Sequence, residues 1–225
     1  MSTFYWSAKT FAVAPATRLL FRPWVKGLGN VPAEGPAILA SNHLSFSDSI
    51  FLPLVIDRRL TFLAKSDYFT GPGLKGWLTA AFFRGVGQLP IDRSGGKASE
   101  AALNAGLRVL DAGDLLGLYP EGTRSPDSRL YRGRTGAAWL ALATGAPVVP
   151  VGLVGTQHLQ PPDTNGFRPH RFSVRVGAPL DFGHPGRRHT LPQRRDATAA
   201  IMDAIGALSG QERVDAYNAT PCARG

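Results

Sequence analysis

Short apolar runs that alternate with stretches of helical periodicity constrain the fold of this chain more than any other feature. Each run has the length expected of a buried strand. Strands that alternate with helices predict an α/β domain whose sheet is mixed, largely parallel and flanked by helices, with right-handed crossovers. The expected strands are residues 37–41, 60–64, 86–91, 115–119 and 148–154, and the expected helices are residues 49–56, 74–83, 98–112 and 135–143.

Three features follow this core toward the C-terminus. Residues 172–176 are a further strand candidate, which we place at an edge of the sheet. Residues 183–196 are rich in arginine and predict an exposed basic loop. Pro192 suits the first turn of a helix, and apolar residues between positions 201 and 208 share one face of that helix.

The N-terminal segment, residues 1–26, mixes aromatic and apolar side chains with basic ones, and Pro15 interrupts any long helix. Aromatic rings beside basic residues suit the headgroup region of a bilayer. A helix pair packed on the protein's own core explains the same pattern equally well, and the residues alone leave both interpretations open. The basic residues of this segment are Lys9, Arg18, Arg22 and Lys26.

The charge of the chain indicates what kind of partner it binds, and its cysteine content excludes two kinds of structure. The 225 residues carry 25 Lys and Arg against 16 Asp and Glu, a formal net charge of +9. This excess predicts an anionic partner, which could be nucleic acid, a phospholipid surface or a phosphorylated substrate. The single cysteine, Cys222, excludes a disulfide framework and a cysteine-based zinc cluster. Glycine and proline divide the uncharged run 137–155, so we expect a helix, a turn and a strand there and not a membrane span.

The loop after strand 37–41 is the first place to look for catalytic residues, because open α/β folds carry them beyond the strand C-termini. It holds His43, and Asp48 follows five positions later. On a continuous helix the two side chains would lie about 140° apart, but a loop histidine and an aspartate in the next helix's first turn can touch. An ionised carboxylate on one imidazole nitrogen leaves the other to accept a proton from a substrate hydroxyl. Both residues could instead be structural, and taken alone the pattern favours that interpretation.

The loop after strand 115–119 carries residue types that suit a phosphate. Gly122 lets the backbone turn tightly, Thr123 and Ser125 offer hydroxyls and nearby amides, and Arg124 offers a guanidinium fork. Glu121 could accept a hydrogen bond from a substrate hydroxyl. An ordinary Pro/Gly turn with surface charge explains the same residues without a ligand.

The segment after strand 86–91 gives weaker signals. Arg93 is a second candidate for contact with a phosphate, and a salt-bridged surface arginine is its alternative. Residues 95–99 lack the full Gly-x-x-x-x-Gly-Lys-Ser/Thr pattern of a phosphate-binding loop. The chain has no Gly-x-Ser-x-Gly sequence, which argues against a serine hydrolase of that type.

Taken together, these loops resemble the motifs of the glycerolipid acyltransferases, the 1-acylglycerol-3-phosphate acyltransferase family. The resemblance covers roughly residues 30–180. Its most specific motifs are a histidine followed after four residues by aspartate (HX4D) and the run Pro-Glu-Gly-Thr-Arg. Tyr119 stands where the family usually has phenylalanine, and Pro90 where it usually has an aromatic residue. In chain order the four motifs are residues 43–48, 87–93, 119–124 and 149–151.

The resemblance implies a role for each matching residue. His43 would be the general base, and Asp48 the residue that orients it. Residues of the second and third motifs would bind the glycerol phosphate of the acceptor, and the motif around Pro150 would help to shape the acyl-donor site. No metal and no cofactor are implied. The implied acceptor-binding residues are Lys65, Arg93, Glu121, Gly122, Thr123 and Arg124.

The implied reaction is direct acyl transfer. His43 would deprotonate the free hydroxyl of 1-acylglycerol 3-phosphate (lysophosphatidic acid), which attacks the thioester of acyl-CoA or acyl carrier protein without an acyl-enzyme. The product is phosphatidic acid, in phospholipid biosynthesis. The first alternative is the same mechanism on another lysolipid or glycolipid acceptor. The second is a non-catalytic basic module that binds lipid or nucleic acid, although no recognised motif interleaves the basic residues with stacking aromatics.

These expectations divide the chain into three parts. Residues 1–29 are expected to form amphipathic membrane-associating helices, because the family's N-terminal helices often dock on the membrane. Residues 30–217 are expected to form a single glycerolipid acyltransferase domain, and residues 218–225 a flexible tail. The expected location is peripheral, on the cytoplasmic face of the cell membrane, with no nucleic-acid partner.

Overall fold

The structure, a computed structural model, describes residues 21, 23–85, 87–91, 98–160, 168–183 and 189–218. Its centre is one sheet with the strand order β1-β7-β6-β2-β5-β3-β4. Neighbouring strands are parallel except for β6 and β7, which are antiparallel. The predicted α/β class with a mixed, largely parallel sheet is confirmed. The strands are β1 (Trp24–Lys26), β2 (Ala37–Ser41), β3 (Leu60–Lys65), β4 (Gln88–Ile91), β5 (Leu115–Leu118), β6 (Val148–Val154) and β7 (Ser173–Val176).

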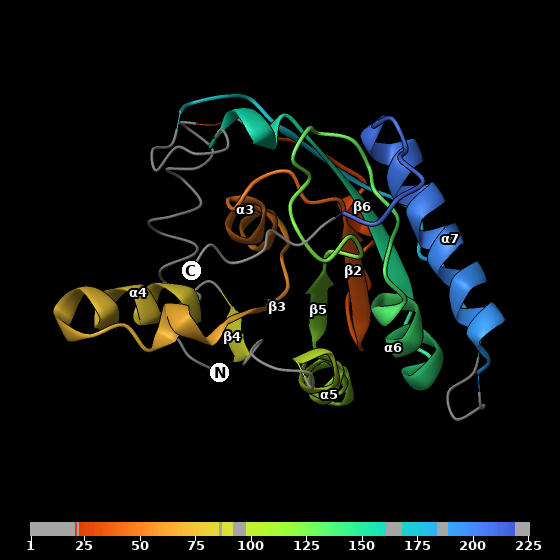
Figure 1. Cartoon of the computed structure of the whole chain (residues 1–225), viewed down its shortest axis with the longest axis horizontal. Coiled ribbons are helices and arrows are strands. Elements are labelled where there is room, and N and C mark those ends of the chain that lie inside the picture. The colour runs from red at the N-terminus through yellow and green to blue at the C-terminus, as the bar shows by residue number, and fades with distance from the viewer. Residues whose placement is uncertain are drawn as a thin grey trace.

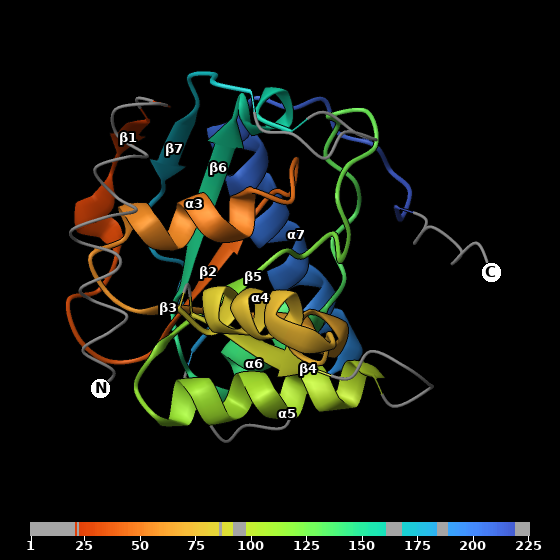
Figure 2. The same ribbon diagram turned by 90° about the vertical axis from the view of Figure 1, so that its left-hand side faces the viewer.

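Helices cover both faces of the sheet (Figures 1 and 2). Leu39 of β2 packs with α3 on one face, whereas Ile38 and Ala40 pack with α5, α6 and α7 on the other. Every residue of β2 is buried, as expected of a central parallel strand covered on both sides. The helices are α3 (Asp48–Val55), α4 (Gly73–Gly85), α5 (Ala98–Asp111), α6 (Gly136–Thr144) and α7 (Leu191–Ser209), with short 3-10 turns η2 (Leu28–Asn30), η3 (Ser66–Phe69) and η4 (Thr156–His158).

The ends of the helices follow from local residue chemistry. α6 ends at Gly145, whose φ of 70° lets its N–H donate to the Ala141 carbonyl. At the start of α7 the Thr190 hydroxyl accepts from the Gln193 N–H, and the Gln193 side chain accepts from the Thr190 N–H. Pro192 lies in the first turn, as predicted.

The prediction of an edge position for β7 is wrong. β7 lies between β6 and β1, and β1 occupies the edge. The three residues of β1 are too few to establish a periodic pattern, so the sequence did not indicate the strand that covers β7. Gly27 follows β1 with a φ of 82°, and a Cβ at this position would overlap the Val176 carbonyl oxygen. The chain can therefore leave β1 this close to β7 only through a glycine.

The basic loop expected over residues 183–196 is wrong in its second half. α7 begins at Leu191, because the Thr190 cap starts the helix before the arginines at 194 and 195. Residues 24–26, placed by the sequence in an N-terminal helical segment, form β1 instead. The predicted helices before residue 21 and the predicted tail from residue 219 lie outside the described residues. No helix in the described part of the chain has the length and apolar character needed to cross a bilayer.

Candidate active site

The two motif loops meet because their strands are neighbours. β2 pairs in parallel with β5, with Ala37 opposite Leu115 and Ala40 opposite Leu118. Both strands therefore end at the same edge of the sheet, and the chain leaves them into residues 42–47 and 119–125. In open α/β sheets this is the edge at which ligands bind.

His43 and Asp48 are in direct contact. His43 Nδ1 lies 2.9 Å from Asp48 Oδ2, which also accepts hydrogen bonds from the N–H groups of Leu44 (2.7 Å) and Ser45 (2.8 Å). Asp48 is fully buried and is the first residue of α3, where the helix dipole stabilises a negative charge. A carboxylate only accepts hydrogen bonds, so it holds the proton of the neutral imidazole on Nδ1 and leaves the lone pair on Nε2.

The imidazole of His43 is stacked on Tyr119. The two ring centroids are 3.8 Å apart, with an angle of 8° between the ring planes, and Phe62 stacks on Tyr119 at 5.1 Å. The Tyr119 hydroxyl lies 3.0 Å from the Ser49 hydroxyl of α3. Burial, with the charge of Asp48, raises the pKa of Tyr119 well above its ordinary value, so the phenol stays neutral. Sequence reasoning noted Tyr119 only as a replacement for phenylalanine and missed this contact.

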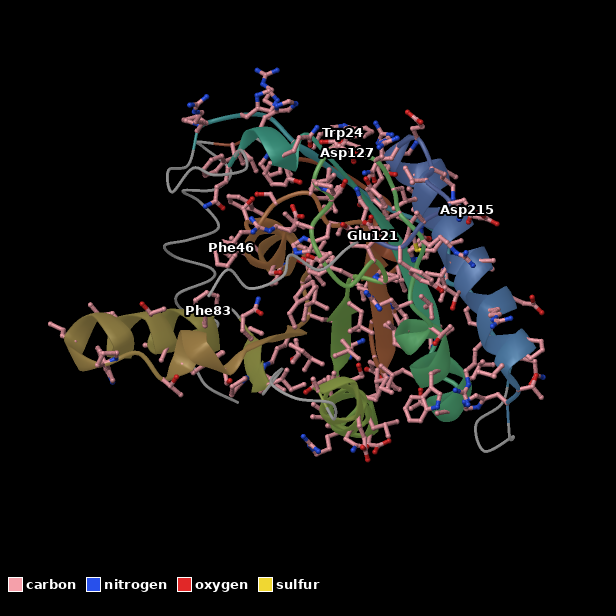
Figure 3. The ribbon with its side chains drawn as sticks, viewed as in Figure 1. Trp24, Phe46, Phe83, Glu121, Asp127 and Asp215 are labelled. Atoms are coloured by element: carbon pink, nitrogen blue, oxygen red, sulfur yellow. The ribbon has the colours of Figure 1, made fainter. Side chains whose placement is uncertain are left out.

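Glu121 accepts hydrogen bonds from the backbone at His43 and at Tyr131. Its Oε1 accepts from the N–H of His43 at 3.3 Å, and its Oε2 accepts from the N–H of Tyr131 at 2.9 Å. The carboxyl is buried, and burial raises its pKa to about 7, although the two backbone hydrogen bonds act in the opposite direction. Figure 3 shows Glu121 near the middle of the view, beside the upper ends of β2 and β5. Because both oxygens already accept backbone hydrogen bonds, the geometry favours a role in positioning over contact with a substrate hydroxyl.

The loop after Glu121 turns as the sequence predicted. Gly122 has a φ of 81°, and its N–H donates to the Tyr119 carbonyl at 2.9 Å. Thr123 is half-buried, and Arg124 is exposed. A Cβ on Gly122 would lie 3.0 Å from Nε of Arg134, so a second guanidinium lies beside this turn. Arg134 is another residue that sequence reasoning missed.

Asn42 fixes the chain just before His43. This buried amide donates to the Leu153 carbonyl at 2.9 Å and accepts from the Leu153 N–H at 2.7 Å, which ties the end of β2 to β6. It also donates to the Gln211 side chain at 2.7 Å. An amide directly after a buried strand, whose first four residues are apolar, is the signal that could have identified it.

The remaining predicted site residues are placed less completely. Lys65 ends β3, which pairs in parallel with β5, so it reaches the same edge of the sheet. Arg93 lies outside the described residues. The structure thus brings together His43, Asp48, Glu121, Gly122, Thr123 and Arg124. Within the described ranges, no three His, Cys, Asp or Glu side chains form a group that could hold a metal ion.

Comparison with known proteins identifies the family. The family described as "Acyltransferase" matches residues 22–154, which include both motif loops. This chain belongs to the acyltransferase family. The match runs from the start of the described chain to the end of β6, so it contains the central part of the sheet.

Named relatives of this acyltransferase differ in their acceptors. The chain is 34% identical over 153 residues to a chloroplastic 1-acyl-sn-glycerol-3-phosphate acyltransferase of Arabidopsis thaliana, an alignment that covers 68% of this chain and 41% of the relative. It is 33% identical over 135 residues to a lyso-ornithine lipid O-acyltransferase of Rhizobium meliloti, covering 59% and 42% of the two chains. The acyltransferase thus spans about two fifths of the length of each of these relatives.

A solved structure supports the fold. The crystal structure of the 1-acyl-sn-glycerophosphate acyltransferase from Thermotoga maritima superimposes with a TM-score of 0.66 at 24% sequence identity. The superposition covers 91% of this chain and 79% of the other. At this identity the likeness establishes a shared architecture.

Proposed function

We propose that this acyltransferase transfers a fatty acyl group from acyl-CoA or acyl carrier protein to the free hydroxyl of 1-acylglycerol 3-phosphate, giving phosphatidic acid. The observation that carries the proposal is the contact at 2.9 Å between His43 and Asp48. This pair follows β2, and the Glu121–Arg124 turn follows β5, the strand next to β2 in the sheet. The Arabidopsis relative, named as a 1-acyl-sn-glycerol-3-phosphate acyltransferase, supports this acceptor. Membership of an enzyme family favours catalysis over a basic module that only binds lipid or nucleic acid.

The reaction proceeds in one transfer. Nε2 of His43 takes the proton of the acceptor hydroxyl while the oxygen attacks the thioester carbonyl carbon. Asp48 holds the imidazolium that forms, because its carboxylate already bonds Nδ1. The tetrahedral intermediate then expels the thiolate, which recovers the proton from His43. The products are the acylated acceptor and the free thiol of the donor, and no acyl-enzyme forms.

The exposed guanidinium of Arg124 and the backbone turn at Gly122 form the proposed phosphate site. Arginine suits a phosphate because its fork can donate two parallel hydrogen bonds. Thr123 adds a hydroxyl to the same turn. Lys65 and Arg93 remain proposed contributors, on the resemblance that first indicated them.

The test measures acyl transfer from acyl-CoA, and from acyl carrier protein, to lysophosphatidic acid. We expect phosphatidic acid from the wild-type protein and none from His43→Ala with the fold intact by circular dichroism. Full activity of His43→Ala would overturn the mechanism. Acylation of a different lysolipid in place of lysophosphatidic acid would overturn the acceptor but keep the mechanism.

A second acceptor is favoured by one observation, the Rhizobium relative that acts on lyso-ornithine lipid. Both candidate acceptors present a hydroxyl, but the anionic group is a phosphate in one and a carboxylate in the other. Arginine can bind either group, so Arg124→Ala should raise the acceptor KM by about 10–100-fold in both cases, the loss of a charge-assisted pair of hydrogen bonds. Competition of the two acceptors at equal concentration in one assay separates them: predominant phosphatidic acid supports the phosphate acceptor, and predominant acylated ornithine lipid overturns it.

The acceptor's chemistry implies where the protein works. A lysolipid resides in a membrane, so the proposed reaction requires the protein to reach a membrane surface. We propose a peripheral location, on the cytoplasmic face where acyl-CoA and acyl carrier protein are supplied. Co-sedimentation with vesicles tests this location, and a protein that stays in the supernatant at low salt contradicts it.

A further inference from the structure

Three large apolar side chains are exposed along the first half of α4. Leu74, Trp77 and Leu78 expose 73%, 63% and 54% of their surface. Their spacing of three and four residues places them on one face of the helix. Figure 1 shows α4 extending from the β4 edge of the sheet, away from the rest of the molecule. A contiguous apolar face of this kind marks a contact surface on a soluble domain.

The second half of α4 joins this face to the candidate active site. Ala80 and Phe83 are buried, and the Phe83 ring contacts the Phe46 ring edge-on, with centroids 6.0 Å apart. Phe46 lies in the loop between His43 and Asp48. Figure 3 shows Phe46 and Phe83 as neighbours between α4 and that loop. α4 is therefore packed against the loop between His43 and Asp48 through two aromatic rings.

The chemistry of the exposed face favours a lipid surface over a protein. Leucine and tryptophan are the residues that interfacial helices bury at the headgroup boundary. The 13 residues of α4 include no aspartate or glutamate, in a chain whose net charge is +9, so anionic headgroups are not repelled. Three side chains of this size expose only about 400 Å², whereas a stable protein interface buries about 800 Å² on each partner.

We propose that Leu74, Trp77 and Leu78 of α4 insert into the headgroup boundary of an anionic bilayer and place the histidine loop at the membrane surface. The proposal rests on the proposed function, because a lysolipid acceptor must be taken from a membrane. It adds a membrane contact within the catalytic domain to the one expected for residues 1–29. Because Phe83 of α4 contacts Phe46, insertion of α4 would hold the loop between His43 and Asp48 beside the lipid.

A local probe tests the contact without any turnover. The full chain has one cysteine, so a Cys222→Ser protein accepts a single polarity-sensitive fluorophore at Leu78→Cys or, as a matched control, at Leu191→Cys. Leu191 is the first residue of α7 and exposes 62% of its surface, against 54% for Leu78, so the two sites are similarly accessible to the fluorophore. With phosphatidylcholine–phosphatidylglycerol vesicles we expect a blue shift and a severalfold rise in emission at position 78 and none at position 191. An unchanged spectrum at position 78, in a protein that sediments with the vesicles, overturns the proposal.

A second measurement uses substitutions. Leu78→Ser together with Trp77→Ser should lower partitioning onto the same vesicles by about tenfold or more, whereas Leu191→Ser should not. With short-chain substrates below their micelle concentration, the double variant should keep the wild-type kcat/KM. Equal partitioning of the double variant and the wild type overturns the proposal, as does loss of self-association in sedimentation velocity, which would make a second copy the occupant. Vesicle contact is measured without acceptor, so it can fail or succeed independently of the proposed reaction.

Discussion

The backbone of His43 is held through Glu121. The His43 N–H donates to Glu121 Oε1 at 3.3 Å, and four residues beyond Glu121 the Ser125 N–H donates to the His43 carbonyl at 2.8 Å. The turn that carries Arg124, the proposed phosphate contact, therefore also fixes the peptide of the proposed base. Proton transfer depends on sub-ångström placement of the base relative to the hydroxyl, so this connection links acceptor binding to catalysis.

Replacing Glu121 tests this connection. Glu121→Gln keeps the shape of the side chain but presents an NH₂ group to one of the two backbone N–H donors, so one of these amides loses its acceptor. We expect kcat to fall about 10–100-fold while the acceptor KM changes little, in steady-state assays. A residue that bound the substrate hydroxyl would raise KM instead, and that result would contradict the positioning role.

Glu121 also makes stability depend on pH. Its pKa is raised from 4.5 to about 7 in the folded protein. A carboxyl with a raised folded pKa stabilises the fold below its unfolded pKa, and this contribution is lost as the pH rises through the folded value. Between pH 4.5 and pH 7, the wild-type protein should therefore lose about 3 kcal/mol of unfolding free energy relative to Glu121→Gln. Urea unfolding of both proteins across this range measures the difference, and parallel curves would contradict it.

Substitutions of His43 and of Asp48 should lower kcat for different reasons. His43→Ala removes the proton acceptor and should lower kcat by about 10³-fold or more. Asp48→Asn keeps an acceptor for the Leu44 and Ser45 amides but no longer holds the imidazole as an anion, so kcat should fall about 10²–10⁴-fold. Neither change should alter the acceptor KM severalfold. Circular dichroism and acyl transfer on the same samples check the prediction, and wild-type kcat for Asp48→Asn would remove Asp48 from the mechanism.

Tyr119 offers a matched pair of substitutions. Tyr119→Phe preserves the stack on His43 and loses only the hydroxyl contact with Ser49, at about 0.5–1.5 kcal/mol of stability. We expect activity within about threefold of wild type, because phenylalanine is the residue usual in the motif. Tyr119→Leu removes the flat support of the imidazole and should lower kcat about tenfold or more. Equal activities of the two variants would show that the stacked ring does not position His43.

Asn42 should matter for stability more than any exposed residue of the loops. Asn42→Ala leaves the buried N–H and carbonyl of Leu153 without partners, at about 2–5 kcal/mol of unfolding free energy. Asn218→Ala is a suitable control, because it removes a single bond to the Arg124 carbonyl and should cost about 1 kcal/mol. Urea denaturation of the two variants measures both losses of unfolding free energy. Equal losses would show that the two Asn42–Leu153 hydrogen bonds stabilise the fold no more than the single Asn218 bond does.

The sequence by itself determined the strand–helix alternation, the sheet class and the two loops that carry His43, Asp48 and Glu121. The strands and helices follow from periodicity, a local property of the chain, and the loops follow from the general rule that open α/β folds carry functional residues beyond the strand C-termini. Only the tertiary structure decided that β7 is interior, that Tyr119 stacks on His43 and that Glu121 accepts a hydrogen bond from the distant N–H of His43. Those outcomes depend on which segments far apart in the chain become neighbours. β1 is too short to show a pattern, and packing decides which N–H groups donate to a buried carboxyl. Sequence separations of 78 and 111 residues, as in the Glu121–His43 and Asn42–Leu153 contacts, are closed by the fold and leave no local signal.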